Sequence, residues 1–152
     1  MSAPEERIVE LGLSLPEVAA PVAAYIPAIR SGSLVLTSGQ LPTREGQLLR
    51  VGKVGGEVGV EEAVECAQQC ALNALAAIRA EVGSLSAVKR VVKVVAFVAS
   101  TPDFTGQSQV ANGASELLGE IFGDAGRHAR SAVGVRVLPL DAPVEVELMV
   151  EV

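Results

Sequence analysis

The end of the chain carries the residues whose types and spacing could do chemistry. The stretch GRHARSAVGVRVLPLDAPVEVELMVEV, residues 126–152, places Arg130 at the head of an apolar strand and glutamates at alternate positions of a second strand, Glu145, Glu147 and Glu151. Arginine is a residue type that binds anions, and glutamate is one that handles protons and water. The first question is therefore whether these side chains face a pocket or open solvent.

The alternation of side chains along a strand divides this stretch into two faces. We predict that residues 130–138 and 143–152 pair as a hairpin that turns near Leu140 and Asp141. One face of the hairpin is expected to pack under helices, and the other to carry Arg and Glu. The first face holds Val133, Val135, Val137, Val144, Val146, Leu148, Val150 and Val152, and the second holds Arg130, Ala132, Gly134, Arg136, Glu145, Glu147, Met149 and Glu151.

Two interpretations of the charged face remain open. It is either a solvated surface with ion pairs, each worth about 0–1 kcal/mol, or the wall of a pocket. Ala132 and Gly134 favour a pocket, because they leave room beside Arg130, and glycine inside a strand often marks close approach of a ligand or another backbone. In the predicted hairpin, Arg130 and Glu145 lie roughly 20 Å apart. If both serve one site, they must come from neighbouring subunits.

Helices and strands must position these residues. Apolar residues at steps of three and four predict a helix over residues 60–82, ended by Gly83. A β-branched run over 88–100 predicts a central strand. A second helix is expected to begin with Thr101 as N-cap and Pro102 at its first position, to bury Val110, Ala114, Leu117, Leu118 and Ile121, and to stop at Gly123.

The N-terminal part is less regular. Residues 4–12 suggest a short amphipathic helix, and prolines at 16, 21 and 27 prevent a regular helix after it. AYIPAIRSGSLVLTSGQLP predicts two short strands joined at residues 31–33, and TREGQLLRVGKVGGEVG a hairpin or loop. The order predicts one α+β domain over 1–152, with a mixed β-sheet, two helices on one face and an N-terminal extension over 1–20.

Composition narrows the function classes. The chain has 152 residues, of which 49% are hydrophobic and only 3% aromatic. A sheet that is apolar on both faces needs cover on both, which predicts self-association. The net charge of −6 argues against a nucleic-acid partner, because phosphate binding depends on clustered Lys and Arg. With no signal peptide and no membrane-spanning run, we expect a cytoplasmic protein with no membrane partner.

The two cysteines, Cys66 and Cys70, are four residues apart within a helical pattern. Zinc and redox motifs usually start from CxxC, and this CxxxC has no second ligand pair. We interpret both as small packing residues and expect no metal ion.

The sequence ARSAVGVRVLPLDAPVEV resembles the C-terminal signature of the RidA/YjgF family, also known as endoribonuclease L-PSP-like. LVLTSGQLP resembles the early strand of that family, and Tyr25 and Asn112 stand at the expected spacings. The resemblance implies a chorismate-mutase-like fold of the bacillus type. It also implies a homotrimer whose sheets form a central barrel, with clefts between the subunits. The best-known branch of the family hydrolyses reactive enamine/imine acids of the 2-aminoacrylate type to 2-keto acids and ammonia, without a cofactor.

Roles carried over from this resemblance are assigned residue by residue. Arg130 would hold the substrate carboxylate and Glu145 would orient or deprotonate the attacking water. Tyr25 would close the cleft, and the residues that would line it are Ser38, Gly39, Asn112 and Ala132. Ala132 stands where well-known deaminating members often have cysteine. The chain is also longer than the compact members, with a Gly-rich region over 45–59, so it resembles a divergent branch.

Other roles for these residues are also consistent with the sequence. Tyr25 could be an interface aromatic residue, Asn112 could make a local helix hydrogen bond, and Glu147 and Glu151 are better read as solvated or interfacial. His128 is either a proton carrier at the cleft mouth or a loop histidine that pairs locally. For the whole protein, the alternatives to a deaminase are a hydrolase on another substrate, a non-catalytic trimer that binds small carboxylates, and the endoribonuclease that the family label suggests.

Overall fold

The computed structural model describes residues 3–19 and 24–152, and the predicted break at Pro21 lies outside these ranges. The predicted short helix, the two early strands and the hairpin after them are all present. The helices and strands are α1 (Ala3–Glu10), β1 (Ala28–Ser31), β2 (Leu34–Thr37), β3 (Thr43–Arg44), β4 (Gln47–Leu48), α2 (Val60–Val82), β5 (Arg90–Ala99), α3 (Gln107–Phe122), β6 (Ala129–Val135) and β7 (Val144–Glu151), with short 3-10 turns η1 (Leu85–Ala87), η2 (Gly123–Gly126) and η3 (Pro139–Asp141).

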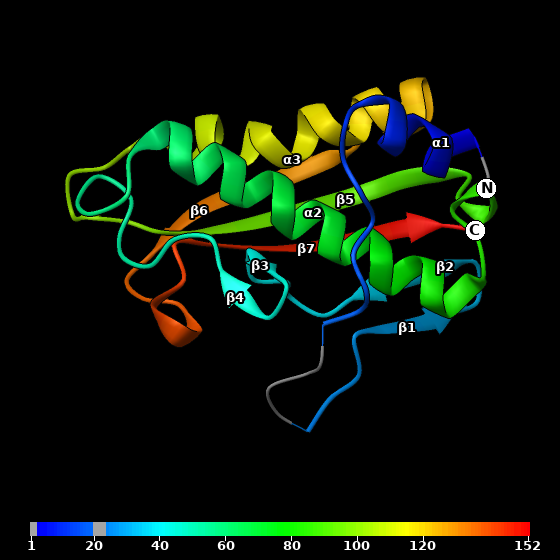
Figure 1. Ribbon diagram of the computed structural model, residues 1–152, viewed down its shortest axis with the longest axis horizontal. Helices are drawn as coiled ribbons and strands as arrows, with labels where there is room; N and C mark the ends of the chain where they lie inside the picture. The colour runs from blue at the N-terminus through cyan, green and yellow to red at the C-terminus, as the bar shows by residue number, and fades with distance from the viewer. Residues whose placement is uncertain (1–2, 20–23) are drawn as a thin grey trace.

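Five strands form one mixed sheet in the order β1-β2-β7-β5-β6, and β3 pairs with β4 in a separate hairpin. β5 and β6 run parallel, as expected for strands joined by a crossover helix, here α3. The other neighbours in the sheet are antiparallel. Helices α2 and α3 lie side by side over one face of the sheet (Figure 1). The predicted mixed α+β fold with two helices on one face is therefore confirmed.

The predicted terminal hairpin is wrong. β6 and β7 are consecutive in the chain, but β5 lies between them and pairs with both. The βαβ unit formed by β5, α3 and β6 places β6 at the edge of the sheet, and β7 enters between β2 and β5. The short connection between β6 and β7 therefore passes across β5, although connections of this length usually join the two strands of a hairpin.

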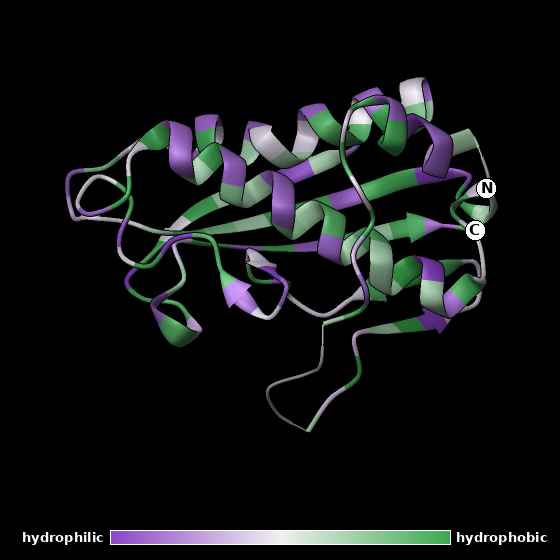
Figure 2. Ribbon diagram, viewed as in Figure 1, coloured by the Kyte–Doolittle hydropathy of each residue, from purple (hydrophilic) through white to green (hydrophobic). Residues whose placement is uncertain are grey.

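The longest helix begins and ends where the sequence predicts. α2 spans Val60–Val82 and stops at Gly83, whose φ of 91° closes the helix. The side of α2 that faces the core is mostly alanine, and Figure 2 shows hydrophobic and hydrophilic segments alternating along α2 and α3. Small side chains let the two helices approach closely: a Cβ added at Gly113 of α3 would lie 2.2 Å from the carbonyl oxygen of Val64 in α2.

We expect Gly113→Ala to destabilise the fold by about 1–3 kcal/mol, because the new methyl group must push α2 and α3 apart. Gly119→Ala is the matched control, since it lies in the same helix and an added Cβ meets nothing within 4 Å. Because alanine has a higher helix propensity than glycine, Gly119→Ala should raise the free energy of unfolding by about 0.5–1 kcal/mol. Urea unfolding of both variants measures the difference, and equal effects would contradict a close contact at Gly113.

The start of the second helix differs from the prediction. α3 begins at Gln107 with Gly106 at its N-cap, so Thr101 and Pro102 are not its first residues. Instead, the amide of Phe104 donates to the carbonyl of Thr101 in a turn. The Phe104 side chain lies against Gly55 and Gly106 and is packed in part against the core. The contact of Phe104 with the Gly-rich loop holds residues 101–104 in a turn, although Thr101 and Pro102 are residue types that favour the start of a helix. The predicted set of buried apolar residues along α3 and its end at Gly123 are confirmed.

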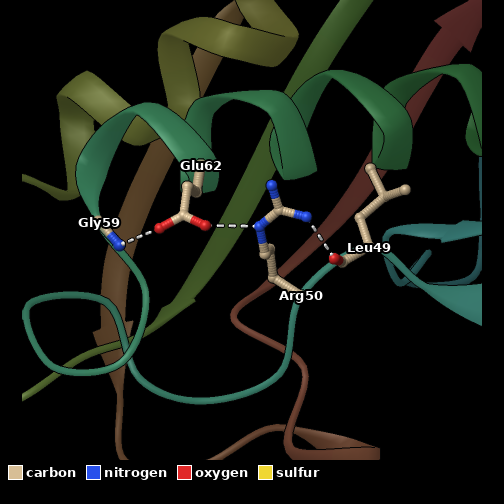
Figure 3. A network of polar contacts seen from close by, with 4 residues as sticks. All are labelled: Leu49, Arg50, Gly59 and Glu62. Carbon is tan, nitrogen blue, oxygen red and sulfur yellow. Dashed lines mark hydrogen bonds and ion pairs between the residues drawn. The ribbon is translucent and has the colours of Figure 1, made fainter.

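The Gly-rich region before α2 is tied to the start of that helix by an ion pair. Arg50 Nε donates to Glu62 Oε2 at 2.5 Å and Arg50 Nη1 to the carbonyl of Leu49, while the amide of Gly59 donates to Glu62 Oε1 at 3.1 Å (Figure 3). The hydrogen bond from Arg50 and then that from Gly59 lower the pKa of the Glu62 carboxyl. Glu62 therefore satisfies an amide at the helix N-terminus and anchors the preceding loop.

The N-terminal segment packs onto the domain. Ile8 of α1 is buried in the core, and Arg7 Nε donates to the carbonyl of Glu120 at 3.1 Å.

Cys66 and Cys70 are buried free thiols, as expected of packing residues, and burial raises the pKa of Cys66 to about 11. No helix within residues 3–19 and 24–152 is long and apolar enough to cross a bilayer.

Candidate functional site

Arg130 lies at the edge of the sheet, on the face that α3 covers. Its Nη1 donates to Asn112 Oδ1 at 2.8 Å and to Ser115 Oγ at 3.1 Å, and its Nη2 donates to the carbonyl of Ser108 at 3.3 Å. All three acceptors belong to α3. Arg130 is half-buried and Asn112 is exposed, so the group is reachable from solvent.

The guanidinium of Arg130 keeps one edge available. A guanidinium has five N–H donors in a fixed plane. Both protons of Nη1 and one of Nη2 are used by α3, and no hydrogen bond from the described part of the chain engages Nε. The Nε–H and the second Nη2–H therefore remain as two donors, and a guanidinium can bind the two oxygens of a carboxylate through such a pair. The geometry therefore suits a bidentate anion contact.

A second group of candidate residues gathers around Glu145 of β7. The Glu145 carboxylate rests against the backbone of Gly39, where an added Cβ would lie 1.8 Å from Oε1. Burial raises the pKa of the Glu145 carboxyl, and the charge of Glu147 raises it further. Within residues 3–19 and 24–152, no basic side chain forms an ion pair with Glu145. Such a carboxyl is a suitable proton acceptor near neutral pH.

Ser38 and Tyr25 lie beside this second group. Ser38 Oγ donates to the carbonyl of Ile26 at 2.6 Å, which ties the segment after β2 to the residue that follows Tyr25. Tyr25 is 44% exposed, and Ile26 and Ile29 are more exposed still. An exposed tyrosine followed by exposed isoleucines fits both the predicted role at a cleft and that at an interface.

The structure corrects the predicted sharing of one face by Arg130 and Glu145. Laterally paired residues point to the same side of a sheet, and Val133, Phe97 and Glu145 lie in one such row. Arg130 is three residues from Val133 and therefore points to the opposite side, toward α3. The valines at 133 and 135 accordingly face away from the helices, which reverses the predicted assignment. Within one chain, Arg130 and Glu145 are separated by the sheet itself.

Ala132 and Gly134 follow Arg130 on the helix face, but the room beside Gly134 is already filled. An added Cβ there would lie 2.9 Å from Gln107 Nε2 of α3. Ala132 packs against the core. The small residues of β6 thus let α3 approach the strand, and the pocket that they suggested is not formed at Gly134.

Ser115, which accepts from Arg130, and His128, which pairs with Ser115, were not among the predicted site residues. Ser115 contacts both Arg130 and His128, and His128 pairs locally with Ser115 and with the carbonyl of Gly126. Spacing could have indicated the group: Asn112 and Ser115 are three apart on α3, and His128 precedes Arg130 by two residues in the extended segment that leads into β6. Each pair therefore shares a face.

Neither α2 nor α3 covers the opposite face of the sheet (Figure 1). Within residues 3–19 and 24–152, one end of that face is covered, where Phe97 and Val135 pack against Leu41, Leu48, Leu138 and Ala142. A shallow hollow on the sheet is lined by Leu36, Thr37, Lys93, Val95, Glu147, Leu148 and Met149. Val133 at the sheet edge is 45% exposed. No group of three or more His, Cys, Asp or Glu in the described ranges is arranged to hold a metal ion.

Comparison with known proteins places this geometry in a family. A curated relative from Trypanosoma cruzi, "Protein TCP17", is 46% identical over 142 residues, which cover 93% of this chain and 89% of the relative. A crystal structure of an Agrobacterium tumefaciens protein of unknown function is 44% identical with a TM-score of 0.92, covering 99% of this chain and 92% of that one. A Shewanella oneidensis structure described as "a putative endoribonuclease" is 37% identical with a TM-score of 0.96, covering 99% and 100%.

The family described as "YjgF/chorismate_mutase-like, putative endoribonuclease" matches residues 5–152, nearly the whole chain and most of the segment taken as an N-terminal extension. The earlier resemblance, which rested on the C-terminal signature and the early strand, is confirmed. The chain belongs to the YjgF/chorismate-mutase-like family.

Proposed function

We propose that the protein is a deaminase that hydrolyses reactive enamine/imine acids of the 2-aminoacrylate/2-iminopropanoate type to 2-keto acids and ammonia. The observation that carries this proposal is the guanidinium of Arg130, held by α3 with a two-donor edge available for a carboxylate. Substrates of this class carry a carboxylate next to the reacting carbon, so an arginine fork fixes the position of that carbon.

The reaction needs little beyond positioning and one proton carrier. Protonation of the enamine carbon gives the iminium ion, and water then attacks its C2 carbon. Glu145 would accept the proton lost by the water and return it to the nitrogen. The C–N bond then breaks, ammonia leaves, and the hydroxyl proton is released as the keto group forms. The raised pKa of Glu145 supports this role, as does the lack of an ion pair between Glu145 and any basic side chain in the described ranges. The carbon–nitrogen double bond is already electrophilic, so we propose no cofactor.

A complete site would combine two subunits. Arg130 and Glu145 point to opposite sides of the sheet in one chain, so a cleft that contains both must take them from neighbouring subunits of the proposed homotrimer. A central barrel would cover the open face of the sheet, and Tyr25 and Ser38 would line the cleft beside Glu145. Asn112 and Ala132 would lie on the Arg130 side.

The direct test is an assay coupled to a PLP-dependent dehydratase that generates 2-aminoacrylate, with release of pyruvate as the readout. The wild-type protein is expected to accelerate release over the spontaneous rate. If it does not accelerate release but pyruvate raises its melting temperature, the alternative of a trimer that binds small carboxylates becomes the better function. Without either effect, both functions are wrong.

Mixing two inactive variants tests the shared cleft. Hybrid trimers of Arg130→Lys and Glu145→Gln chains contain clefts with both natural residues only if the two come from different subunits. Random mixing in equal amounts should then restore about a quarter of the wild-type activity. Unmixed trimers of each variant are the controls, and no restoration in hybrids would contradict a site between subunits.

The ribonuclease activity in the family description is not proposed for this chain. Binding of phosphates relies on clustered basic residues, whereas this protein has 18 Asp and Glu against 12 Lys and Arg. RNA cleavage that is lost with Arg130→Ala and persists through purification would overturn this conclusion.

A further inference from the structure

His128, Ser115 and Arg130 form a chain of hydrogen bonds whose direction is fixed at one end by the backbone. His128 Nδ1 lies 2.6 Å from the carbonyl oxygen of Gly126. A carbonyl oxygen can only accept, so Nδ1 carries a proton. The neutral ring then has its lone pair at Nε2, because the two nitrogens of a neutral imidazole have opposite roles.

The direction is passed on through Ser115. His128 Nε2 lies 2.8 Å from Ser115 Oγ, and a lone pair at Nε2 requires the serine hydroxyl to donate its single proton to the ring. The lone pairs of Ser115 Oγ are then left to accept the Nη1 proton of Arg130 at 3.1 Å. All donors therefore point one way, from Arg130 to Ser115, to His128 and to Gly126, and successive hydrogen bonds of this kind polarise one another.

We propose that His128 and Ser115 are positioning residues that orient the Arg130 guanidinium before the substrate carboxylate binds. Without His128 as an acceptor, the serine hydroxyl can turn to the backbone of its own helix, as serines in helices often do. It would then hold Nη1 of Arg130 less firmly. With the network intact, Asn112 and Ser115 both hold Nη1, and Nε–H has no partner among the described residues. A guanidinium oriented in advance loses less freedom on binding.

This inference rests on the proposed function for its ligand but has a test that needs no ligand. The protein contains a single histidine, so selective ¹⁵N labelling of histidine gives one pair of ring nitrogen signals. We expect the wild-type spectrum at neutral pH to show a protonated Nδ1 and an unprotonated Nε2. Ser115→Ala and Arg130→Gln should each shift the Nε2 signal. A protonated Nε2 tautomer, or an Nε2 signal unchanged by both substitutions, would overturn the proposal.

Ligand binding provides the second test, with variants that separate the two ring nitrogens. His128→Gln places an amide oxygen near the former Nε2 and can still accept from Ser115. His128→Asn is shorter and keeps only a donor near the former Nδ1. Ser115→Ala removes the hydroxyl and is safe for a helix, because alanine is its best former.

We expect Ser115→Ala and His128→Asn each to weaken pyruvate binding about five-fold, the effect of one ordinary hydrogen bond. In the coupled assay they should raise KM and leave kcat nearly unchanged. His128→Gln should bind pyruvate with most of the wild-type affinity. The double variant with both Ser115→Ala and His128→Asn should bind pyruvate no more weakly than either single variant. Ser14→Ala, an exposed serine after α1, is the control for a serine far from the site.

The outcomes separate this inference from the proposed function. If the wild type shows no turnover, the deaminase proposal fails, while the histidine spectra and the pyruvate affinities still decide the role of His128 and Ser115. If the wild type turns over substrate and both positioning variants match its KM and its pyruvate affinity, the inference alone fails.

Discussion

Replacing Arg130 with lysine is expected to lower kcat/KM for 2-aminoacrylate by about 100-fold or more. Lysine keeps the positive charge but offers a single ammonium on a flexible stem, so it cannot make two parallel hydrogen bonds to a carboxylate. It also cannot reach Asn112, Ser115 and the carbonyl of Ser108 together, as the guanidinium does. Two charge-assisted hydrogen bonds of roughly 1.5–3 kcal/mol each account for an effect of this size.

The measurement compares coupled-assay kinetics and pyruvate-induced thermal shifts of Arg130→Lys with those of the wild type. Arg136→Lys is the matched control, because Arg136 follows the same strand, is exposed and has no side-chain hydrogen bond or ion pair to the described residues. We expect it to behave as the wild type. Full activity of Arg130→Lys would show that charge alone suffices and that the fork is not used.

The second large effect concerns the carboxylate of Glu145. Glu145→Gln should lower kcat by about 10²- to 10⁴-fold, the usual contribution of a general base. Wild-type activity should fall as the pH drops, because the carboxylate must be ionised to accept a proton from water. This loss should set in above the pH at which an ordinary carboxylate titrates, because burial and then Glu147 raise the pKa of Glu145.

Glu147→Gln separates the two causes of that raised pKa. It removes the neighbouring charge on the same face of β7 and leaves Glu145 half-buried, so the acid limb of kcat/KM should move to lower pH without the loss of kcat. The pH–rate profiles of both variants and the wild type give the comparison. An acid limb that stays in place in Glu147→Gln, or that persists in Glu145→Gln, would assign the titration to another group.

Much of the framework could be predicted from local patterns. The limits of α2 match their prediction because 23 residues of helical periodicity lie between two glycines. The alternation along β7 also holds: its valines are buried and its glutamates are half-buried on the other face. The start of α3 could not be predicted in this way, since the contact of Phe104 with Gly55 comes from a loop some fifty residues away in the chain.

For the site, the sequence by itself determined which residues of any one strand share a face, because side chains alternate with a period of two along a strand. It also determined the family, through the strand signature around Arg130. Only the tertiary structure decided which face of β6 meets the helices, because that depends on the strand inserted between β6 and β7. That choice turned Arg130 toward Asn112 and Ser115 and away from Glu145. Local alternation has no information on strand order, which is set by the packing of the whole sheet against α2 and α3.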